Sequence, residues 1–152
     1  MKNISKNISY KESTRSRTAV KKGIDNTPSM IKLKAMRLVA EKVFQPVREW
    51  YGKPISINSF FRCVELNSKV GGVTYSQHVN GEAIDIDTDE DNAKLFHYIL
   101  NNLEFDKLIW EYGDDLAPAW IHLSYREVGN RQESYRIYRD EHGIKRTVKF
   151  MD

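Results

Sequence analysis

The chain has 152 residues and a mass of 17.8 kDa, the size of one domain with its own core. A hydrophobic content of 40% excludes a disordered chain, and no apolar run approaches the roughly 20 residues that a membrane helix needs. The single cysteine, Cys63, excludes an internal disulfide, and we expect this thiol to be a packing residue rather than a nucleophile.

The net charge of +3 conceals an uneven distribution. Residues 1–37 carry ten Lys and Arg against two acidic residues, whereas residues 38–152 carry 14 basic and 19 acidic residues. A basic segment can hold an anionic polymer such as nucleic acid or a wall polymer, although solvated surface is the commoner explanation. No nucleic-acid motif or interleaved aromatic residue accompanies the charge, so we do not expect nucleic acid as a partner.

Helices are predicted over the first third of the chain. SYKE (9–12) has capping-box spacing, and a second short helix would end at Gly23. A longer helix would begin with Thr27 as N-cap and Pro28 as its first residue, and Pro46 should kink it. Its buried face would consist of Leu33, Met36, Ala40, Val43, Val47 and Trp50.

Strands and short helices are predicted over the middle of the chain. PISINSF (54–60) and EAIDID (82–87) alternate as strands do, and CVELNSKV (63–70) is typical of a short helix. Thr88 and Asp91 would start a further helix, with Leu95, Ile99, Leu100 and Leu103 facing inward.

The C-terminal part is predicted to form two hairpins. FDKLIWEYG (105–113) and AWIHLSYRE (119–127) flank a turn-forming segment, and SYRIYRDEHGIKRTVKF (134–150) would turn at residues 142–143. Because helices precede strands, we predict an α+β fold with helices packed on an antiparallel sheet. Without repeats or linkers the chain is expected to be one domain, 1–152, with a basic N-terminal arm (1–25) and a C-terminal hairpin (127–152).

The stretch YSQHVNGEAIDID (75–87) combines a histidine, a glycine and two aspartates. Gly81 permits a turn that brings His78 back beside the strand that carries Asp85 and Asp87. Carboxylates opposite core isoleucines need a partner, which is either a metal ion or solvent. Taken alone, this stretch is more typical of a loop and an ordinary strand than of a metal site.

His122, in the strand WIHLSY, is the next candidate ligand. A histidine in an apolar strand is more often a buried, hydrogen-bonded residue. Together with His78 and Asp85, however, it completes the three protein ligands of a catalytic zinc. His97, in a helix, and His142, in a surface turn, are expected to be structural.

Hydrolysis by zinc also needs a base, and Glu111 is the candidate. If the hairpin turns near Asp115, Glu111 lies across from Trp120 and diagonal to His122, on the same face. A register shift of one residue would move Glu111 to the opposite face. Arg62 can clamp a carboxylate or oxyanion with two hydrogen bonds, and its plainer role is a surface salt bridge.

The segment SQHVNGEAID (76–85) resembles the SxHxxGxAxD signature of the M15 zinc peptidases. These are D-alanyl-D-alanine carboxypeptidases, dipeptidases and phage cell-wall endopeptidases. WIHLSY resembles the strand that carries their last histidine ligand. STRSRTAVKKGIDNTP (13–28) and LNSKVGGVTYSQH (66–78) are similar to the small single-domain branch, so the resemblance covers residues 8–126.

The resemblance implies a hedgehog/DD-peptidase-like fold with one zinc ion held by His78, Asp85 and His122. It also implies that Arg62 binds a substrate carboxylate or the developing oxyanion. Ser76, which opens the signature, would hydrogen-bond to the substrate or to a metal ligand.

Two departures from the family pattern bear on the site. The better-known branches place the base as ExxH or HxH around the last ligand, but those positions are Ala119 and Trp120 here. Glu111 on the neighbouring strand is therefore the replacement. The SGYRS-like segment of the family reads NSFFRC (58–63), without its glycine and closing serine, but Arg62 is present.

These observations predict a zinc-dependent peptidase that hydrolyses peptidoglycan stem peptides as a monomer, as a D,D-carboxypeptidase or an L,D-endopeptidase. The N-terminus lacks the apolar core of a signal peptide. This favours a protein that is cytoplasmic until release, or a phage or prophage lysis or tail-associated protein, that acts at the bacterial cell wall. The alternative is a catalytically inactive, zinc-binding module of the same fold that binds the wall or a protein.

Overall fold

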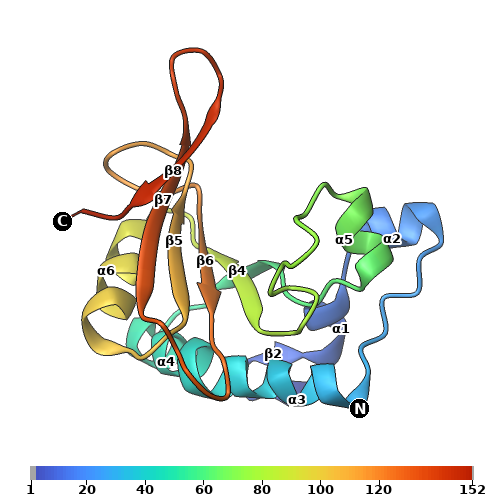
Figure 1. The fold of residues 1–152 in the computed structure, drawn as a ribbon. Helices are drawn as coiled ribbons and strands as arrows, with labels where there is room; N and C mark the ends of the chain where they lie inside the picture. The colour runs from blue at the N-terminus through green and yellow to red at the C-terminus, as the bar shows by residue number, and fades with distance from the viewer. Residues whose placement is uncertain (1–2, 152) are drawn as a thin grey trace.

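A six-stranded sheet forms the centre of the molecule (Figure 1). The computed structural model describes residues 3–151. The strands lie in the order β3-β4-β6-β5-β7-β8. Their bounds are Ser56–Ser59 (β3), Ala83–Asp87 (β4), Lys107–Glu111 (β5), Trp120–Ser124 (β6), Glu133–Arg139 (β7) and Lys145–Lys149 (β8). Helices pack against this sheet, which confirms the predicted α+β fold.

The sheet is mostly antiparallel, with one exception that the sequence did not predict. β5 and β7 pair in parallel, with Glu111 opposite Ile137. The other neighbours in the sheet pair antiparallel, including the two predicted hairpins β5–β6 and β7–β8. A parallel pair cannot be joined by a tight turn, and here the chain crosses from β5 to β7 by way of β6.

The N-terminal segment is folded into the body of the protein. It forms a small hairpin of β1 (Asn3–Ser5) and β2 (Ile8–Ser9), followed by α1 (Tyr10–Thr14) and α2 (Arg17–Lys22). Ser9 and Glu12 form the predicted capping box, and α2 ends at Gly23 as expected. Ile4 and Ile8 are 5% and 1% exposed and belong to the main core. The basic charge of this segment is therefore carried by an integral part of the fold.

The long helix starts later than the sequence predicted and contains a widened turn. Its three parts are α3 (Met30–Val39), a π-helical turn η1 (Ala40–Phe44) and α4 (Gln45–Tyr51). The prediction of Thr27 as N-cap was wrong, because Ser29 accepts from the backbone N–H of Lys32, while the Thr27 hydroxyl donates to Asp25. Pro46 falls in the first turn of α4, directly after η1, where its missing N–H is accommodated by the wide turn.

The remaining helices are α5 (Val64–Lys69) and α6 (Asn92–Asn102). Cys63 is the N-cap of α5 and packs against the core, as expected for a packing thiol. Asp91 is the N-cap of α6. Trp50 was predicted to be buried but is 42% exposed and stacks on Tyr98, with 3.9 Å between ring centroids.

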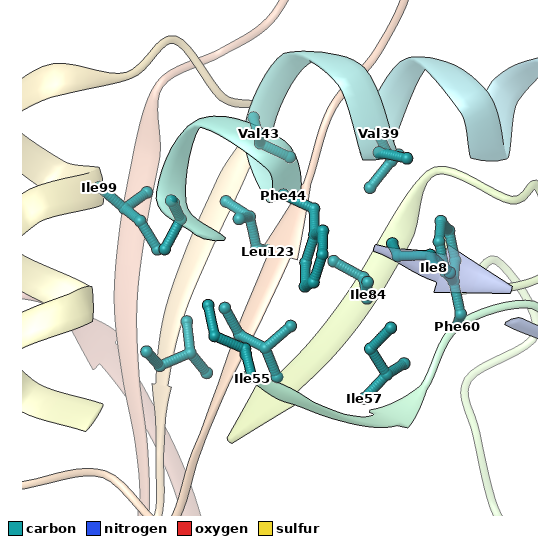
Figure 2. Packing of buried hydrophobic residues seen from close by; sticks show 14 of the residues in the cluster. Ile8, Val39, Val43, Phe44, Ile55, Ile57, Phe60, Ile84, Ile99 and Leu123 are labelled. Atoms are coloured by element: carbon teal, nitrogen blue, oxygen red, sulfur yellow. The ribbon is translucent and has the colours of Figure 1, made fainter. Parts of the chain in front are cut away.

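The core lies between the helices and one face of the sheet. Figure 2 shows Phe44 of η1 close to Ile84 of β4 and Leu123 of β6, and all three side chains are at most 1% exposed. Burying a side chain of this size contributes about 1.5–3 kcal/mol. Because side chains alternate along a strand, burial of Ile84, Ile86, Ile121 and Leu123 turns the residues between them to the opposite face. That opposite face carries the predicted site.

Candidate metal centre

Three polar side chains meet at the face of the sheet opposite the buried isoleucines of β4 and β6. Asp85 of β4 lies directly opposite His122 of β6, so strand pairing alone brings these two residues together. His78 comes from the loop before β4 and is 2% exposed. One ligand atom from each of the three residues lies within 4.8 Å of the others. The structure therefore brings together all three side chains that were predicted as zinc ligands.

Asp85 lies between the two imidazoles and faces one with each oxygen. Its Oδ2 is 3.3 Å from Nε2 of His78, and its Oδ1 is 3.1 Å from Nδ1 of His122. Burial raises the pKa of Asp85, but the charges and hydrogen bonds of His78 and His122 outweigh burial and bring the pKa well below its usual range. The carboxylate is therefore ionised at neutral pH, as a metal ligand must be.

The hydrogen bonding of His78 tests whether these residues fit a metal ion. Nδ1 of His78 is 2.7 Å from the carbonyl oxygen of Phe60, and a carbonyl can only accept, so the proton is on Nδ1. In the neutral ring, Nε2 then presents a bare lone pair to a carboxylate oxygen 3.3 Å away. Two lone pairs face each other favourably only across a cation or a proton. The donor set and the orienting carbonyl match those of catalytic zinc sites.

The loop that carries His78 is fixed against helix α3. Gly81 has φ of 73°, and a Cβ there would lie 2.6 Å from the carbonyl oxygen of Lys32. The ammonium group of Lys32 donates to the carbonyl of Val79 at 2.7 Å. Gly81 is therefore needed both for its left-handed backbone and for close approach to α3. This confirms the turn that the sequence predicted.

Arg62 and Ser76 are connected beside the cluster. The guanidinium of Arg62 donates to Oγ of Ser76 over a long 3.4 Å, and the same Oγ accepts from the backbone N–H of His78. Nε of Arg62 is buried and has no acceptor among the described residues. Burial lowers the pKa of Arg62, while the charges of Asp85 and Glu111 raise it. Arg62 is therefore not in a surface salt bridge but faces the acidic groups of the site.

Asn26 orders the backbone around Arg62, and the sequence reasoning did not single it out. Its Nδ2 donates to the carbonyls of Thr14 and Phe61 at 2.9 and 3.0 Å. Its Oδ1 accepts from the backbone N–H of Cys63 at 2.7 Å. One buried side chain thus holds both neighbours of Arg62 and the end of α1. Asn26 lies in the segment GIDNTP, whose family resemblance was the only indication of such a role.

Glu111 lies on the predicted face, and the hairpin register is the one that was expected. Glu111 is opposite Trp120, and Ile109 is opposite His122, so no register shift has occurred. Burial raises the pKa of Glu111, and the negative charge of Asp85 raises it further, whereas His122, Lys145 and Arg62 lower it. A partly buried carboxyl with a raised pKa beside a histidine and an aspartate is suited to proton transfer.

Asp87 and the two remaining histidines of the chain lie outside the cluster. Asp87, two residues after Asp85, accepts a hydrogen bond of 2.7 Å from Asn92 at the start of α6. Asp87 therefore contacts the start of α6 and not one of the three metal-ligand candidates. His97 is exposed on α6, and His142 is exposed at the tip of the β7–β8 hairpin, so neither belongs to the cluster.

A buried carboxylate supports the loop from its other side. Asp106, just before β5, is fully buried and binds the guanidinium of Arg131 at 2.8 and 3.0 Å. It also accepts from Nε2 of Gln77, the residue before His78, at 3.0 Å. From the sequence, Asp106 is predicted only as part of a strand, because its partners Gln77 and Arg131 are 29 and 25 residues away.

Two histidines, an ionised aspartate, a glutamate with a raised pKa and an arginine, gathered on one sheet face, are the groups of a metal-dependent hydrolase. The Peptidase M15 family model matches residues 6–124, and the chain belongs to this family of zinc-dependent peptidases. The matched region contains α1 to β6 and every residue of the candidate site. It agrees with the extent of the resemblance that the sequence motifs indicated. It ends before β7 and β8.

A search of curated proteins found no match to this chain. Among residues 3–151, no helix has both the length and the apolar character that crossing a membrane requires.

Proposed function

We propose that this chain is a zinc-dependent peptidase that hydrolyses peptide bonds in peptidoglycan stem peptides. The observation that carries the proposal is the orientation of His78: its Nδ1 is bound to the Phe60 carbonyl, and its Nε2 faces an ionised Asp85. A cation between these two atoms stabilises the arrangement, and His122 supplies a third ligand atom for it. The peptidoglycan substrate is supported by the sequence resemblance to wall-cleaving members of the family.

His78, Asp85 and His122 would hold the zinc ion. When bound, zinc supplies a Lewis acid for the scissile carbonyl and lowers the pKa of a coordinated water to about 7. With three protein ligands, one coordination position is left for that water. His78 and His122 would bind the ion as neutral imidazoles, and with the single negative charge of Asp85 the loaded site would keep a net positive charge that favours an anionic transition state.

Glu111 would move the proton. Its carboxylate accepts a proton from the attacking water, while the water oxygen forms a bond to the carbonyl carbon. The same proton then passes to the leaving nitrogen as the C–N bond breaks, which leaves a free amine and a carboxylic acid that releases its proton to solvent. Burial and the negative charge of Asp85 raise the pKa of Glu111, which favours a carboxylate that both accepts and returns a proton.

Arg62 would hold a negative charge on the substrate. Its buried Nε lacks an acceptor within the described part of the chain, so the guanidinium can turn a free donor toward a carboxylate or the developing oxyanion. Ser76 would fix the position of Arg62 relative to the backbone of His78, because its hydroxyl oxygen accepts a hydrogen bond from each.

Digestion of purified peptidoglycan tests the proposal. Parent protein and a Glu111→Gln variant are incubated with the wall, with and without a chelator, and the released peptides are identified by mass. We expect new amino and carboxyl termini with the parent, loss of activity with chelator and recovery on adding zinc. Glu111→Gln should bind zinc but cleave about 10²–10⁴-fold more slowly.

One outcome would contradict the role of Glu111, and another would contradict the peptidase function. If Glu111→Gln cleaves as fast as the parent, Glu111 is not the base. If the parent binds zinc with the expected stoichiometry of one but releases no peptide, the chain is a non-catalytic zinc-binding module. The masses of the released peptides also decide between removal of a terminal residue and cleavage within the stem peptide.

A further inference from the structure

A cleft of about 610 Å³ lies beside the candidate metal centre and is lined by three arginines. Arg15 and Arg17 come from the junction of α1 and α2, and Arg62 comes from the segment after β3. Ser59, also on the cleft wall, is the strand partner of Asp85. The three metal-ligand candidates do not line the cleft, and Arg62 and Ser59 are the lining residues that connect it with them. Its volume is within the roughly 300–1,000 Å³ of sites that enclose drug-sized ligands.

Of the three arginines, Arg62 also faces the carboxylates of Asp85 and Glu111, whereas the charges of Arg15 and Arg17 have no such counterpart in the cleft lining. None of the nine described residues that line it is acidic. Arg131, Arg136 and Arg146 elsewhere on the surface each contact a carboxylate. Within residues 3–151, no such contact is found for Arg15 or Arg17. The two exposed guanidinium groups of Arg15 and Arg17 therefore give the cleft a positive charge that attracts an anion.

The position of each arginine adds to this argument. Arg17 is the first residue of α2, where the helix dipole disfavours a positive side chain. Nε of Arg62 is buried without an acceptor among the described residues, which is uncommon for a buried donor. Asn26 binds the backbone carbonyl of Thr14, next to Arg15, and both neighbours of Arg62. The same buried amide therefore fixes the segments that carry the charges on the two sides of the cleft.

We propose that the cleft of Arg15, Arg17 and Arg62 is the subsite for an acidic segment of the substrate, a peptide with at least two free carboxylates on one side of the scissile bond. Arg62 would bind the carboxylate nearer the zinc ligands, and Arg15 and Arg17 would bind the one further away. The proposal rests on the proposed peptidase function and narrows its substrate class. Stem peptides with a free glutamate carboxylate are preferred over those in which it is an amide.

A comparison of two substrates and three proteins tests this subsite. The substrates are stem peptides that differ only in a free or amidated carboxylate at glutamate. The proteins are the parent, the double variant Arg15→Gln/Arg17→Gln, and the control Lys21→Gln/Lys22→Gln. The control removes the same charge from exposed residues of the same helix α2 that do not line the cleft. KM and kcat are measured at low and at physiological salt.

We expect the parent to show a KM about tenfold lower for the free carboxylate, which corresponds to about 1.4 kcal/mol. The double arginine variant should lose most of this preference through KM, with little change in kcat, and the lysine control should keep it. The difference should shrink as salt rises, because the cleft is open to solvent. An equal preference in all three proteins would overturn the subsite.

A binding measurement separates failure of the subsite from failure of the proposed function. Calorimetry with the free-carboxylate peptide is carried out on the same three full-length proteins loaded with zinc. If no protein cleaves any stem peptide but binding is weakened about tenfold only in the arginine variant, the peptidase function fails and the anion subsite stands. If the parent cleaves the peptides and the arginine variant binds them as tightly as the parent, the function stands and the subsite fails.

Discussion

Gly81→Ala is the substitution for which the structure gives the clearest expectation. An alanine at φ of 73° costs about 1–2 kcal/mol in backbone strain. Its Cβ would also lie 2.6 Å from the carbonyl oxygen of Lys32 and 2.9 Å from Cγ of Met36. Met36 can adjust, but the Lys32 oxygen is backbone of α3, and forcing extra volume into a packed interior costs about 1–3 kcal/mol. The total expected loss of unfolding free energy is about 2–5 kcal/mol.

Gly129→Ala is the matched control for this prediction. Gly129 has φ of 77°, and nothing lies within 4 Å of the position of its Cβ, so this variant should lose only the strain of about 1–2 kcal/mol. Urea denaturation of the metal-free proteins measures both losses from the midpoints, provided that the m-values agree. Zinc titration adds a second measurement, because displacing the loop moves His78. Affinity should fall about 10–100-fold in Gly81→Ala, as for other changes to groups that orient a ligand.

Equal losses of stability in the two glycine variants would refute the reasoning. The close approach of the loop to α3 would then contribute nothing beyond backbone conformation. If Gly81→Ala is destabilised but binds zinc as tightly as the parent, the position of His78 does not depend on the packing of the loop against α3.

Four further predictions follow from the site and its supports. Asp106→Asn should lower the unfolding free energy at pH 7 by about 1.5–3 kcal/mol, the value of hydrogen bonds to a charged group. Burial raises the pKa of Asp106, but hydrogen bonds from Arg131 and Gln77 bring this pKa below its usual value. The contribution of Asp106 to the free energy of unfolding is therefore fully present above the unfolded-state pKa and is lost as the pH falls through the folded-state pKa. Urea denaturation at pH 7 and at about pH 3 should therefore show a smaller difference from the parent at the lower pH. For Glu111, the raised pKa predicts that kcat/KM decreases toward acid pH with a midpoint above the usual glutamate pKa of about 4.3. A pH profile of kcat/KM without this decrease would remove Glu111 as base. Free zinc at about 100 times its Kd should raise the free energy of unfolding by about 2.7 kcal/mol and Tm by roughly 5–11 °C. In thermal denaturation, His122→Ala should abolish this shift and His142→Ala should retain it. Asn26→Ala removes three hydrogen bonds and should lower stability by about 1.5–4.5 kcal/mol in urea denaturation, together with weaker binding of the acidic peptide.

The parts of the site that depend on local periodicity could be predicted from the sequence. Alternation in EAIDID and WIHLSY places the isoleucines on one face and Asp85 and His122 on the other, and the pairing of these two strands then puts both polar residues side by side. Glu111 was placed correctly because a short hairpin leaves few registers. Gly81 was assigned correctly because a tight turn before a strand favours glycine.

The parts that depend on contacts distant in sequence could not be predicted in this way. Asn26 reaches Phe61, and Asp106 reaches Gln77, through side-chain hydrogen bonds that leave no periodic pattern. The arginine cleft joins residues 15–17 to residue 62 only after α1 and β3 have been packed together. The start of the long helix was misassigned because Thr27 and Ser29 are both acceptable caps, and local hydrogen bonding to Asp25 decided between them.

The parallel pairing of β5 with β7 has a consequence for the order in which the protein is assembled. Residues 133–149 are synthesised after both strands of the β5–β6 hairpin, and until they pair, β5 is an exposed edge whose last residue is Glu111. The backbone N–H of Tyr112, the next residue, also waits for the carbonyl of Ile137. A nascent chain can thus gather His78, Asp85 and His122 from the region that the family shares, while the strand bearing Glu111 is closed only by the later segment. Under the proposed function, the three metal ligands would be in place before the sheet is complete, and the strand that carries Glu111 would gain its second neighbour afterwards.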